Sequence, residues 1–242
     1  MHHILHFQEI DSTNTYLKRE YAGLPDQSVV LADHQTQGRG RLGRIWSDNS
    51  DSLTFSLLLK SGIRPKSSSL LPLLAGASLI LTLKKLGIEA TIKWPNDILL
   101  QGKKVCGILA EAIYDPDLKA IILGIGLNLN DKAFPAEIQN KAISLYQVTG
   151  RRFVPMEVLH LFLNEFDVLY ANFSKGRKDF LPIVKAHFFL TGKRIYLNYY
   201  GEDLHTEVCG LADDGRLEVK SEDKILLIDA GEVTLEENYG MC

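Results

Sequence analysis

The sequence predicts an α+β fold: a larger domain of strands and helices, followed by a small β-barrel. Strand-like and helix-like segments are interspersed through residues 1–188, and apolar residues recur at helical spacing from Leu159 to Phe173. Near Thr191 the pattern changes to short β-like runs that turns separate, which is typical of a small barrel. We therefore expect one domain at residues 1–188 and a second at 189–242.

The elements of the first domain follow from apolar spacing and from residues that start or end helices. We expect strands at residues 4–10, 28–34, 52–60, 91–93, 98–100, 104–112 and 118–128. We expect helices at residues 15–20, 70–86, 155–173 and 178–189. Asp11–Asn14 can cap the first helix, Ser67–Ser69 the second, and Pro155 suits the first turn of the third. The apolar stretch Leu70–Leu83 is expected to be a core helix that is too short to cross a bilayer.

Turn signals divide the remaining strands. Gln101–Lys103 separates two strands of the first domain and predicts a hairpin. Asp213–Gly215 predicts a tight turn in the second domain. The strands expected there are residues 194–200, 204–212, 216–220, 225–230 and 232–235.

Composition bounds the function classes. The chain has 242 residues and a net charge of −3, so no overall basic field attracts nucleic acid. The three cysteines, Cys106, Cys209 and Cys242, show no spacing typical of a metal site or a disulfide framework. This cysteine usage fits a reducing compartment, and we expect the protein to be cytoplasmic.

Residues 38–46 combine three glycines with three arginines. Glycine lets a backbone approach a ligand closely, and guanidinium groups bind phosphate or carboxylate in a planar fork. The spacing Gly38-x-Gly40-x-x-Gly43 matches a dinucleotide motif, but the next segment is a strand and not the helix that this motif needs. This composition therefore predicts that the loop binds an anion and closes over it. The alternatives are a solvated surface loop or a local nucleic-acid patch.

Residues 93–97 read Lys-Trp-Pro-Asn-Asp. Pro95 restricts Trp94 to extended geometry, which holds Lys93, Asn96 and Asp97 in a defined cluster. Alone this run would be a plain turn. Beside a cationic loop, Asn96 and Asp97 become candidates for orienting nucleotide phosphates, directly or through Mg²⁺. The two runs together indicate nucleotide chemistry on a small acid.

Five runs together resemble biotin protein ligases, which attach biotin to a lysine of carboxylase carrier domains. They are Asp11–Asn14, Gln35–Trp46, Lys93–Asp97, Gly102–Leu109 and Gly124–Asn128. The resemblance covers nearly the whole chain and implies a mixed β-sheet catalytic domain flanked by helices, with a small SH3-like barrel at the C-terminus. Because the first run lies so near residue 1, we expect the form without an N-terminal DNA-binding domain, and no DNA binding.

The resemblance implies two half-reactions. The carboxylate of biotin attacks the α-phosphorus of ATP, which gives biotinoyl-5′-AMP and pyrophosphate, and a carrier lysine then displaces AMP. The implied cofactors are ATP and Mg²⁺, with Mg²⁺ travelling with ATP instead of occupying a fixed metal site. The implied partner is the biotin carboxyl carrier protein of acetyl-CoA carboxylase or of another biotin-dependent carboxylase. We expect a monomer or homodimer with no membrane partner.

The resemblance also implies roles for individual residues. Arg39 and Lys104 neutralise the two reacting anions, and Asp97 orients or deprotonates the incoming lysine amine. The residues implied in biotin binding are Ser12, Thr13, Asn14, Gln35, Gly38, Arg39, Gly40, Arg41, Lys104, Gly107, Leu109, Gly124 and Gly126. Those implied in ATP binding are Arg39, Arg41, Arg44, Trp46, Asn96 and Asn128.

Three other functions are consistent with parts of this pattern. A lipoate or octanoate ligase of the same superfamily would want a pocket for a purely apolar acyl tail, whereas Ser12, Thr13 and Gln35 favour the polar ring of biotin. A non-enzymatic module would use the small barrel to hold a partner. A nucleic-acid-binding protein would show a steep salt dependence.

Overall fold

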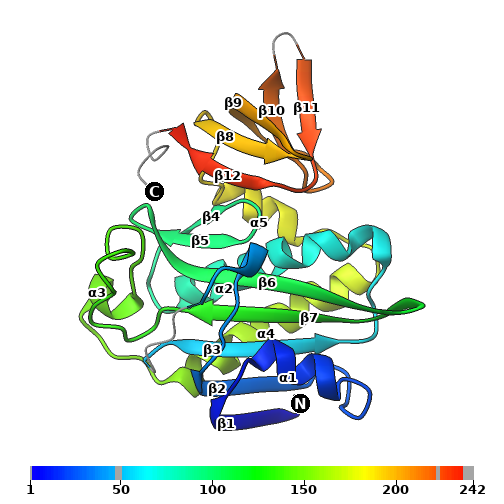
Figure 1. The fold of residues 1–242 in the computed structure, drawn as a ribbon, viewed down its shortest axis with the longest axis vertical. Helices are drawn as coiled ribbons and strands as arrows, with labels where there is room; N and C mark the ends of the chain where they lie inside the picture. Colours follow the sequence, from blue (N-terminus) through cyan, green and yellow to red (C-terminus); the bar gives the residue numbers. More distant parts are fainter. Residues whose placement is uncertain (1, 47–50, 222–223, 237–242) are drawn as a thin grey trace.

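A computed structural model describes residues 2–46, 51–221 and 224–236 of the chain (Figure 1). A seven-stranded mixed sheet forms its centre, with the order β1-β2-β3-β7-β6-β5-β4. The strands are β1 Ile4–Ile10, β2 Val29–Gln35, β3 Leu53–Leu59, β4 Thr91–Lys93, β5 Asp97–Leu100, β6 Lys103–Asp115 and β7 Asp117–Leu127. Strands β1 and β2 pair in parallel, and the other neighbours are antiparallel. The mixed sheet is therefore as expected.

Helices cover both faces of this sheet (Figure 1). Helix α1 (Thr13–Glu20) lies on one face, and Ser12 caps it by accepting a hydrogen bond from the Thr15 backbone N–H. Helices α2 (Leu71–Lys85), α4 (Pro155–Ser174) and α5 (Phe180–Ala186) lie on the other face.

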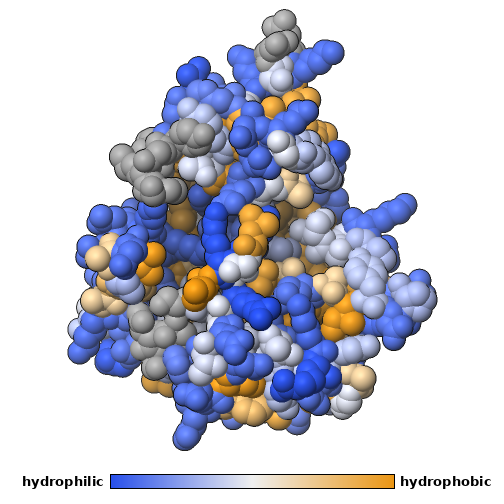
Figure 2. All heavy atoms as spheres, viewed as in Figure 1, coloured by the Kyte–Doolittle hydropathy of each residue, from blue (hydrophilic) through white to orange (hydrophobic). Residues whose placement is uncertain are grey.

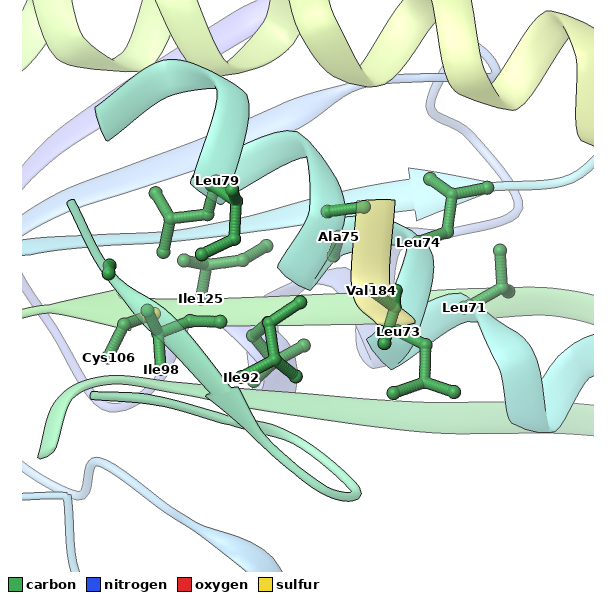
Figure 3. Packing of buried hydrophobic residues seen from close by; sticks show 14 of the residues in the cluster. Leu71, Leu73, Leu74, Ala75, Leu79, Ile92, Ile98, Cys106, Ile125 and Val184 are labelled. Atoms are coloured by element: carbon green, nitrogen blue, oxygen red, sulfur yellow. The ribbon is translucent and has the colours of Figure 1, made fainter. Parts of the chain in front are cut away.

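Alternation along the strands explains the two layers. In β3, Leu57 packs into the large core under α2 and α4, whereas Leu58 packs with Leu17 of α1. Both faces of β3 are therefore buried, which is why its sequence is almost continuously apolar. Figure 3 shows the large core between α2 and the sheet, with Leu79 and Ile125 among its members. Burying each such side chain contributes roughly 1.5–3 kcal/mol.

Two helix predictions need correction, and one short helix was missed. Ser67–Ser69 belong to a 3₁₀ turn, Pro65–Leu70, and do not cap α2, which begins at Leu71 without a side-chain cap. Helix α5 is shorter than the predicted residues 178–189 because it ends at Ala186. The short helix α3 (Leu145–Thr149), with a capping box between Ser144 and Gln147, was not predicted.

The 3₁₀ turn and α2 follow each other directly. Together they form a helical stretch, Pro65–Lys85, of 21 residues, and an 18-residue window within it has a mean hydropathy of 1.4, so length alone does not exclude a membrane span. However, 67% of its apolar window is buried inside the protein. Burial, and not shortness, thus makes it a core helix, as predicted.

A second sheet follows, with five antiparallel strands in the order β11-β10-β9-β8-β12 (Figure 1). Its strands are β8 Arg194–Tyr199, β9 Glu202–Leu211, β10 Leu217–Ser221, β11 Lys224–Ile228 and β12 Glu232–Leu235. Asp213–Gly215 forms the predicted tight turn between β9 and β10, with Gly215 at φ 90°. Among the described residues β11 and β12 do not pair, so backbone hydrogen bonds leave the expected barrel open. The predicted domain boundary after residue 188 stays a prediction.

The second sheet packs directly on the first domain. The indole N–H of Trp94 donates to the carbonyl of Gly215 at 3.3 Å, and the ammonium of Lys185 pairs with Asp213 at 2.6 Å. A Cβ on Gly215 would lie 2.3 Å from Leu70 Cδ2, and its φ of 90° is one that side chains rarely adopt, so both features favour glycine here. These contacts hold the β9–β10 turn of the second sheet against the first domain.

Candidate active site

One pocket of about 610 Å³ lies where α1, the Gly/Arg loop, the β5–β6 hairpin, β7 and β12 meet. The predicted site residues that line it are Ser12, Thr13, Asn14, Gln35, Arg39, Gly40, Arg41, Arg44, Trp46, Asn96, Asp97, Lys104, Gly107, Leu109, Gly124 and Gly126. Two predicted site residues, Gly38 and Asn128, are not in its lining. Segments that are distant in sequence thus converge on one cavity.

The inner end of the pocket is a fixed polar network. Thr13 donates from its backbone N–H and its hydroxyl to Gln35 Oε1, at 2.8 and 3.1 Å. The hydroxyl of Ser56 lies 2.6 Å from Thr13 Oγ1 and 2.5 Å from Asn14 Oδ1. Asn14 Nδ2 donates to Glu111 Oε2 at 2.7 Å. Because these groups are mutually bonded and the first four are buried, the network presents a ligand with preorganised donors and acceptors.

The wall between the two ends is bare backbone. A Cβ on Gly124 would lie 2.4 Å from Asn14 Oδ1, and one on Gly126 would lie 2.3 Å from the ring of Trp46. The same indole is 3.2 Å from a Cβ position on Gly107. A side chain at Gly124 or Gly126 would collide with Asn14 or Trp46, so glycine lets these two side chains pack against the wall of the pocket.

The mouth of the pocket is cationic. Lys104 Nζ pairs with Asp97 Oδ1 at 2.7 Å and lies 5.9 Å from the centroid of the Trp46 ring. The backbone of Lys104 is held by segment 141–143, since its N–H donates to Lys141 O and its carbonyl accepts from Ile143 N. The amide of Asn128 also donates to the carbonyl of Lys104, at 3.3 Å. Asn128 therefore fixes the strand that carries Lys104, and its predicted nucleotide contact stays a prediction.

The Gly/Arg loop, which we call the lid (residues 38–46), folds back on itself. Gly40 N donates to Arg44 O at 2.7 Å, and Trp46 N donates to Gly38 O at 3.0 Å. A Cβ on Gly38 would lie only 2.7 Å from Trp46 O, so this glycine allows the neck of the lid to close. Gly38 thus shapes the lid without lining the pocket.

Two arginines tie the lid to the rest of the site. Arg41 donates to Asn96 Oδ1 and to the carbonyl of Gly231, both at 3.1 Å. Arg44 forms an ion pair with Glu232 of β12. Burial lowers the pKa of the Arg41 guanidinium, Asp97 partly offsets this, and Arg44 adds to it. The lid and the second sheet therefore meet at the mouth of the pocket.

Several residues of the site were not predicted. Thr54 of β3 lines the pocket, and its hydroxyl is a buried group without a hydrogen-bond partner among the described residues. Ser56, two residues further along β3, is fully buried and bonds to Thr13 and Asn14. The available signal was two hydroxyls spaced by two in an otherwise apolar run, residues 53–59. Glu232 and its neighbours in β12 also line the pocket, and nothing local marks them.

Lys93 also lines the pocket. Its run was singled out in the sequence, but no role was predicted for it. Burial lowers the pKa of its ammonium; the carboxylate of Asp97 opposes that shift, and Lys104 and Arg44 add to it. A cation kept in a partly dry pocket costs the fold free energy, which is typical of a group that serves ligand binding.

Lys93→Met is therefore expected to stabilise the fold near neutral pH by about 1 kcal/mol, or roughly 2–4 °C in melting temperature. A lysine whose folded pKa is lowered destabilises the protein wherever it is protonated. That cost disappears as pH rises through the interval between the lowered pKa and the ordinary lysine value of 10.5. The gain should therefore be full at neutral pH and shrink toward pH 10.

Calorimetric melting of Lys93→Met at neutral and alkaline pH measures this effect. Lys84→Met, at an exposed position on α2, is the matched control and should change the melting temperature little. A lower melting temperature for Lys93→Met at neutral pH would contradict the account.

Within residues 2–46, 51–221 and 224–236, no group of three or more His, Cys, Asp or Glu side chains could hold a metal ion. Cys106 is buried, and burial raises the pKa of its thiol, which makes it unreactive.

Comparison with known proteins agrees with this geometry. Residues 6–128 match the family model described as the biotin/lipoate A/B protein ligase family. The chain is 30% identical over 240 residues to the bifunctional ligase/repressor BirA of Bacillus subtilis, covering 96% of this chain and 74% of that protein. It is 29% identical to the biotin–[acetyl-CoA-carboxylase] ligase of Mycobacterium tuberculosis, covering 92% and 85%.

Solved structures give the same result. Biotin protein ligase from Aquifex aeolicus, in complex with biotin and ATP, superposes with a TM-score of 0.87 at 32% identity, over 97% of this chain and 98% of that chain. The fold and the site thus define a ligase. The chain belongs to the biotin/lipoate A/B protein ligase family.

Proposed function

We propose that this protein is a biotin protein ligase that activates biotin as biotinoyl-5′-AMP and transfers it to a lysine of a biotin carboxyl carrier domain. One observation carries the proposal: a single cavity joins a fixed polar network at its inner end to clustered cations at its mouth. The names of the relatives and the biotin and ATP in the Aquifex aeolicus structure support it.

The inner network suits the ureido ring of biotin. Ser12, Thr13, Asn14 and Gln35 line the pocket. Gln35 orients Thr13, and the buried hydroxyl of Ser56 bonds to Thr13 and Asn14. A site built from matched polar groups rejects an acid that lacks them, since its buried groups would then stay unpaired. Gly107, Gly124 and Gly126, with Leu109, leave room for the bicyclic ring and its chain.

The mouth suits the first half-reaction. A carboxylate oxygen of biotin forms a bond to the α-phosphorus of ATP while the bond from that phosphorus to pyrophosphate breaks. Both reactants are anions, so their approach requires cations between them, and Lys104, Arg39 and Arg41 stand there. Phosphoryl transfer depends mainly on such positioning and charge stabilisation. Mg²⁺ would arrive with the phosphates of ATP and lower their charge.

The second half-reaction joins the acceptor amine to biotin. The neutral amine attacks the acyl carbon of the adenylate, the carbon–oxygen bond to AMP breaks, and the amine loses a proton. Asp97 is the carboxylate at the mouth that lies beside Lys104, so we assign it the role of orienting or deprotonating the amine. Trp46 would pack against adenine.

The lid is expected to protect the adenylate from water. Ligand phosphates should draw Arg39, Arg41 and Arg44 together and bury the reactive anhydride. Limited proteolysis with trypsin tests this expectation, because the three arginines are its cleavage sites. Biotinoyl-AMP should slow cleavage at residues 39–44 severalfold, and equal rates with and without it would contradict closure.

Mass spectrometry of a biotin carboxyl carrier domain tests the function itself. After incubation with the protein, biotin and Mg-ATP, the domain should carry one biotin, located on a lysine. Parallel incubations with lipoate or octanoate should leave it unmodified, because neither acid carries the polar ring that the network matches. Modification by octanoate but not by biotin would replace the proposal with the related acyl ligase activity.

A further inference from the structure

Two large apolar side chains stand in solvent on the lid. Leu42 is 76% exposed and Ile45 is 86% exposed, although both line the mouth of the pocket. Figure 2 shows hydrophobic residues directly beside strongly hydrophilic ones at the hollow in the centre of this face. Solvent-facing apolar groups at the entrance to a site mark a surface that a partner covers.

Among the described residues, Leu42 and Ile45 make no side-chain contact that accounts for their place on the lid, whereas two neighbouring arginines are bonded to other parts of the site. Arg41 and Arg44 bond to Asn96, Gly231 and Glu232. Leu42 adopts φ 55°, a left-handed conformation that leucine rarely takes. Packing within the described residues does not explain why a leucine occupies this strained position, because its side chain is mostly exposed to solvent.

The rim around them is positively charged. Arg39, Arg41, Arg44, Lys93, Lys104 and Lys141 line the pocket, against the carboxylates Asp97 and Glu232. Once pyrophosphate has left, the adenylate retains a single phosphate charge, so this rim stays positive when the acceptor arrives. Its charge therefore complements an acidic protein segment.

We propose that Leu42 and Ile45, together with the basic rim, form the docking surface for the acceptor protein, whose segment around the target lysine is apolar and acidic. This inference rests on the proposed function, since it names the partner of the second half-reaction. The acceptor amine must pass this rim to reach Asp97 and Lys104, so the partner necessarily contacts the lid.

The double variant Leu42→Asn/Ile45→Thr tests the proposal. Asparagine tolerates the left-handed conformation and threonine keeps the branched Cβ, so the lid backbone is preserved. Two readouts are compared: transfer to a biotin carboxyl carrier domain, and trapping of the adenylate by hydroxylamine, which is too small to need a docking surface. The KM for the carrier should rise about tenfold, since buried apolar area is lost, while hydroxylamine trapping and the KM for ATP stay unchanged.

Controls make each outcome decisive. Leu42→Met/Ile45→Val should retain the wild-type KM for the carrier, and so should Val168→Ser, which removes an exposed apolar residue on α4. Salt should raise the KM of the wild type for the carrier but not its hydroxylamine rate. If the double variant melts early, Leu42→Asn alone gives the same comparison.

Three results would contradict either the docking surface or the proposed function, and the two failures can be told apart. An unchanged KM for the carrier refutes the docking surface. A raised KM for ATP shows that the two side chains cover the nucleotide instead, which also refutes it. Wild-type protein that forms no adenylate would contradict the proposed function itself, a failure that the hydroxylamine assay detects without any carrier.

Discussion

Replacing Lys104 by alanine is expected to slow biotin-dependent release of pyrophosphate by about 10²–10³-fold, as for the loss of one preorganised charge donor in other enzymes. Its ammonium is held by Asp97 at 2.7 Å and by a strand whose backbone is fixed on both sides. Two nearby cations, Arg41 and Arg44, are already engaged at Asn96 and Glu232. Alanine would also leave Asp97 facing the incoming phosphates.

Lys103→Ala is the matched control for this prediction. Lys103 is the adjacent lysine, but its ammonium lies 3.4 Å from the carbonyl of Gln139 and it does not line the pocket. Its loss should change the rate less than twofold. Steady-state pyrophosphate release at saturating ATP measures both variants, and Lys104→Arg should recover part of the rate. A Lys104→Ala enzyme within a few-fold of wild type would contradict the assignment.

Gly124→Ala is expected to weaken biotin binding about 10–100-fold and to destabilise the fold by about 1–3 kcal/mol. The new Cβ would lie 2.4 Å from Asn14 Oδ1. Asn14 cannot yield easily, because Ser56 and Glu111 hold its two amide atoms. Displacing it leaves buried polar groups unpaired, and each such group costs about 1–3 kcal/mol.

Gly23→Ala separates this effect from a general loss of glycine. A Cβ on Gly23 meets nothing nearer than Glu20 O at 3.9 Å, and its φ is not in the left-handed region. This variant should bind biotin and melt as the wild type does. Calorimetric titration with biotin and thermal melting measure both changes. Wild-type affinity in Gly124→Ala would show that the inner network does not bind the ring.

Much of the fold was predictable because its signals are local. Every strand of the second sheet follows from short β-like runs and turns such as Asp213–Gly215. Errors arose where local signals compete. Ser67–Ser69 resemble a cap, but Pro65 begins a 3₁₀ turn that absorbs them. Helix α3 spans five residues, too few for a period to be read, although its capping box was visible.

The candidate site divides in the same way. The lid and the Lys93–Asp97 run are contiguous, so their composition alone marks them. Thr54 and Ser56 were not predicted, because hydroxyl residues are common in strands. Their role becomes clear only when the structure shows that the residues at the start of α1 lie opposite them. Glu232 could not be predicted because its role depends on an ion pair with Arg44. Arg44 lies almost two hundred residues earlier in the chain, and only the folded structure brings the two side chains together.

Exchange of labelled pyrophosphate into ATP, without any carrier protein, tests the central claim most directly. The central claim is that the guanidinium groups of the lid and the ammonium of Lys104 neutralise the carboxylate of biotin and the phosphates of ATP, so that the two react reversibly. We predict exchange that requires biotin and Mg²⁺, saturates with both, and is lost in Lys104→Ala. Absence of exchange in the wild type, or exchange that proceeds equally without biotin, would contradict the account.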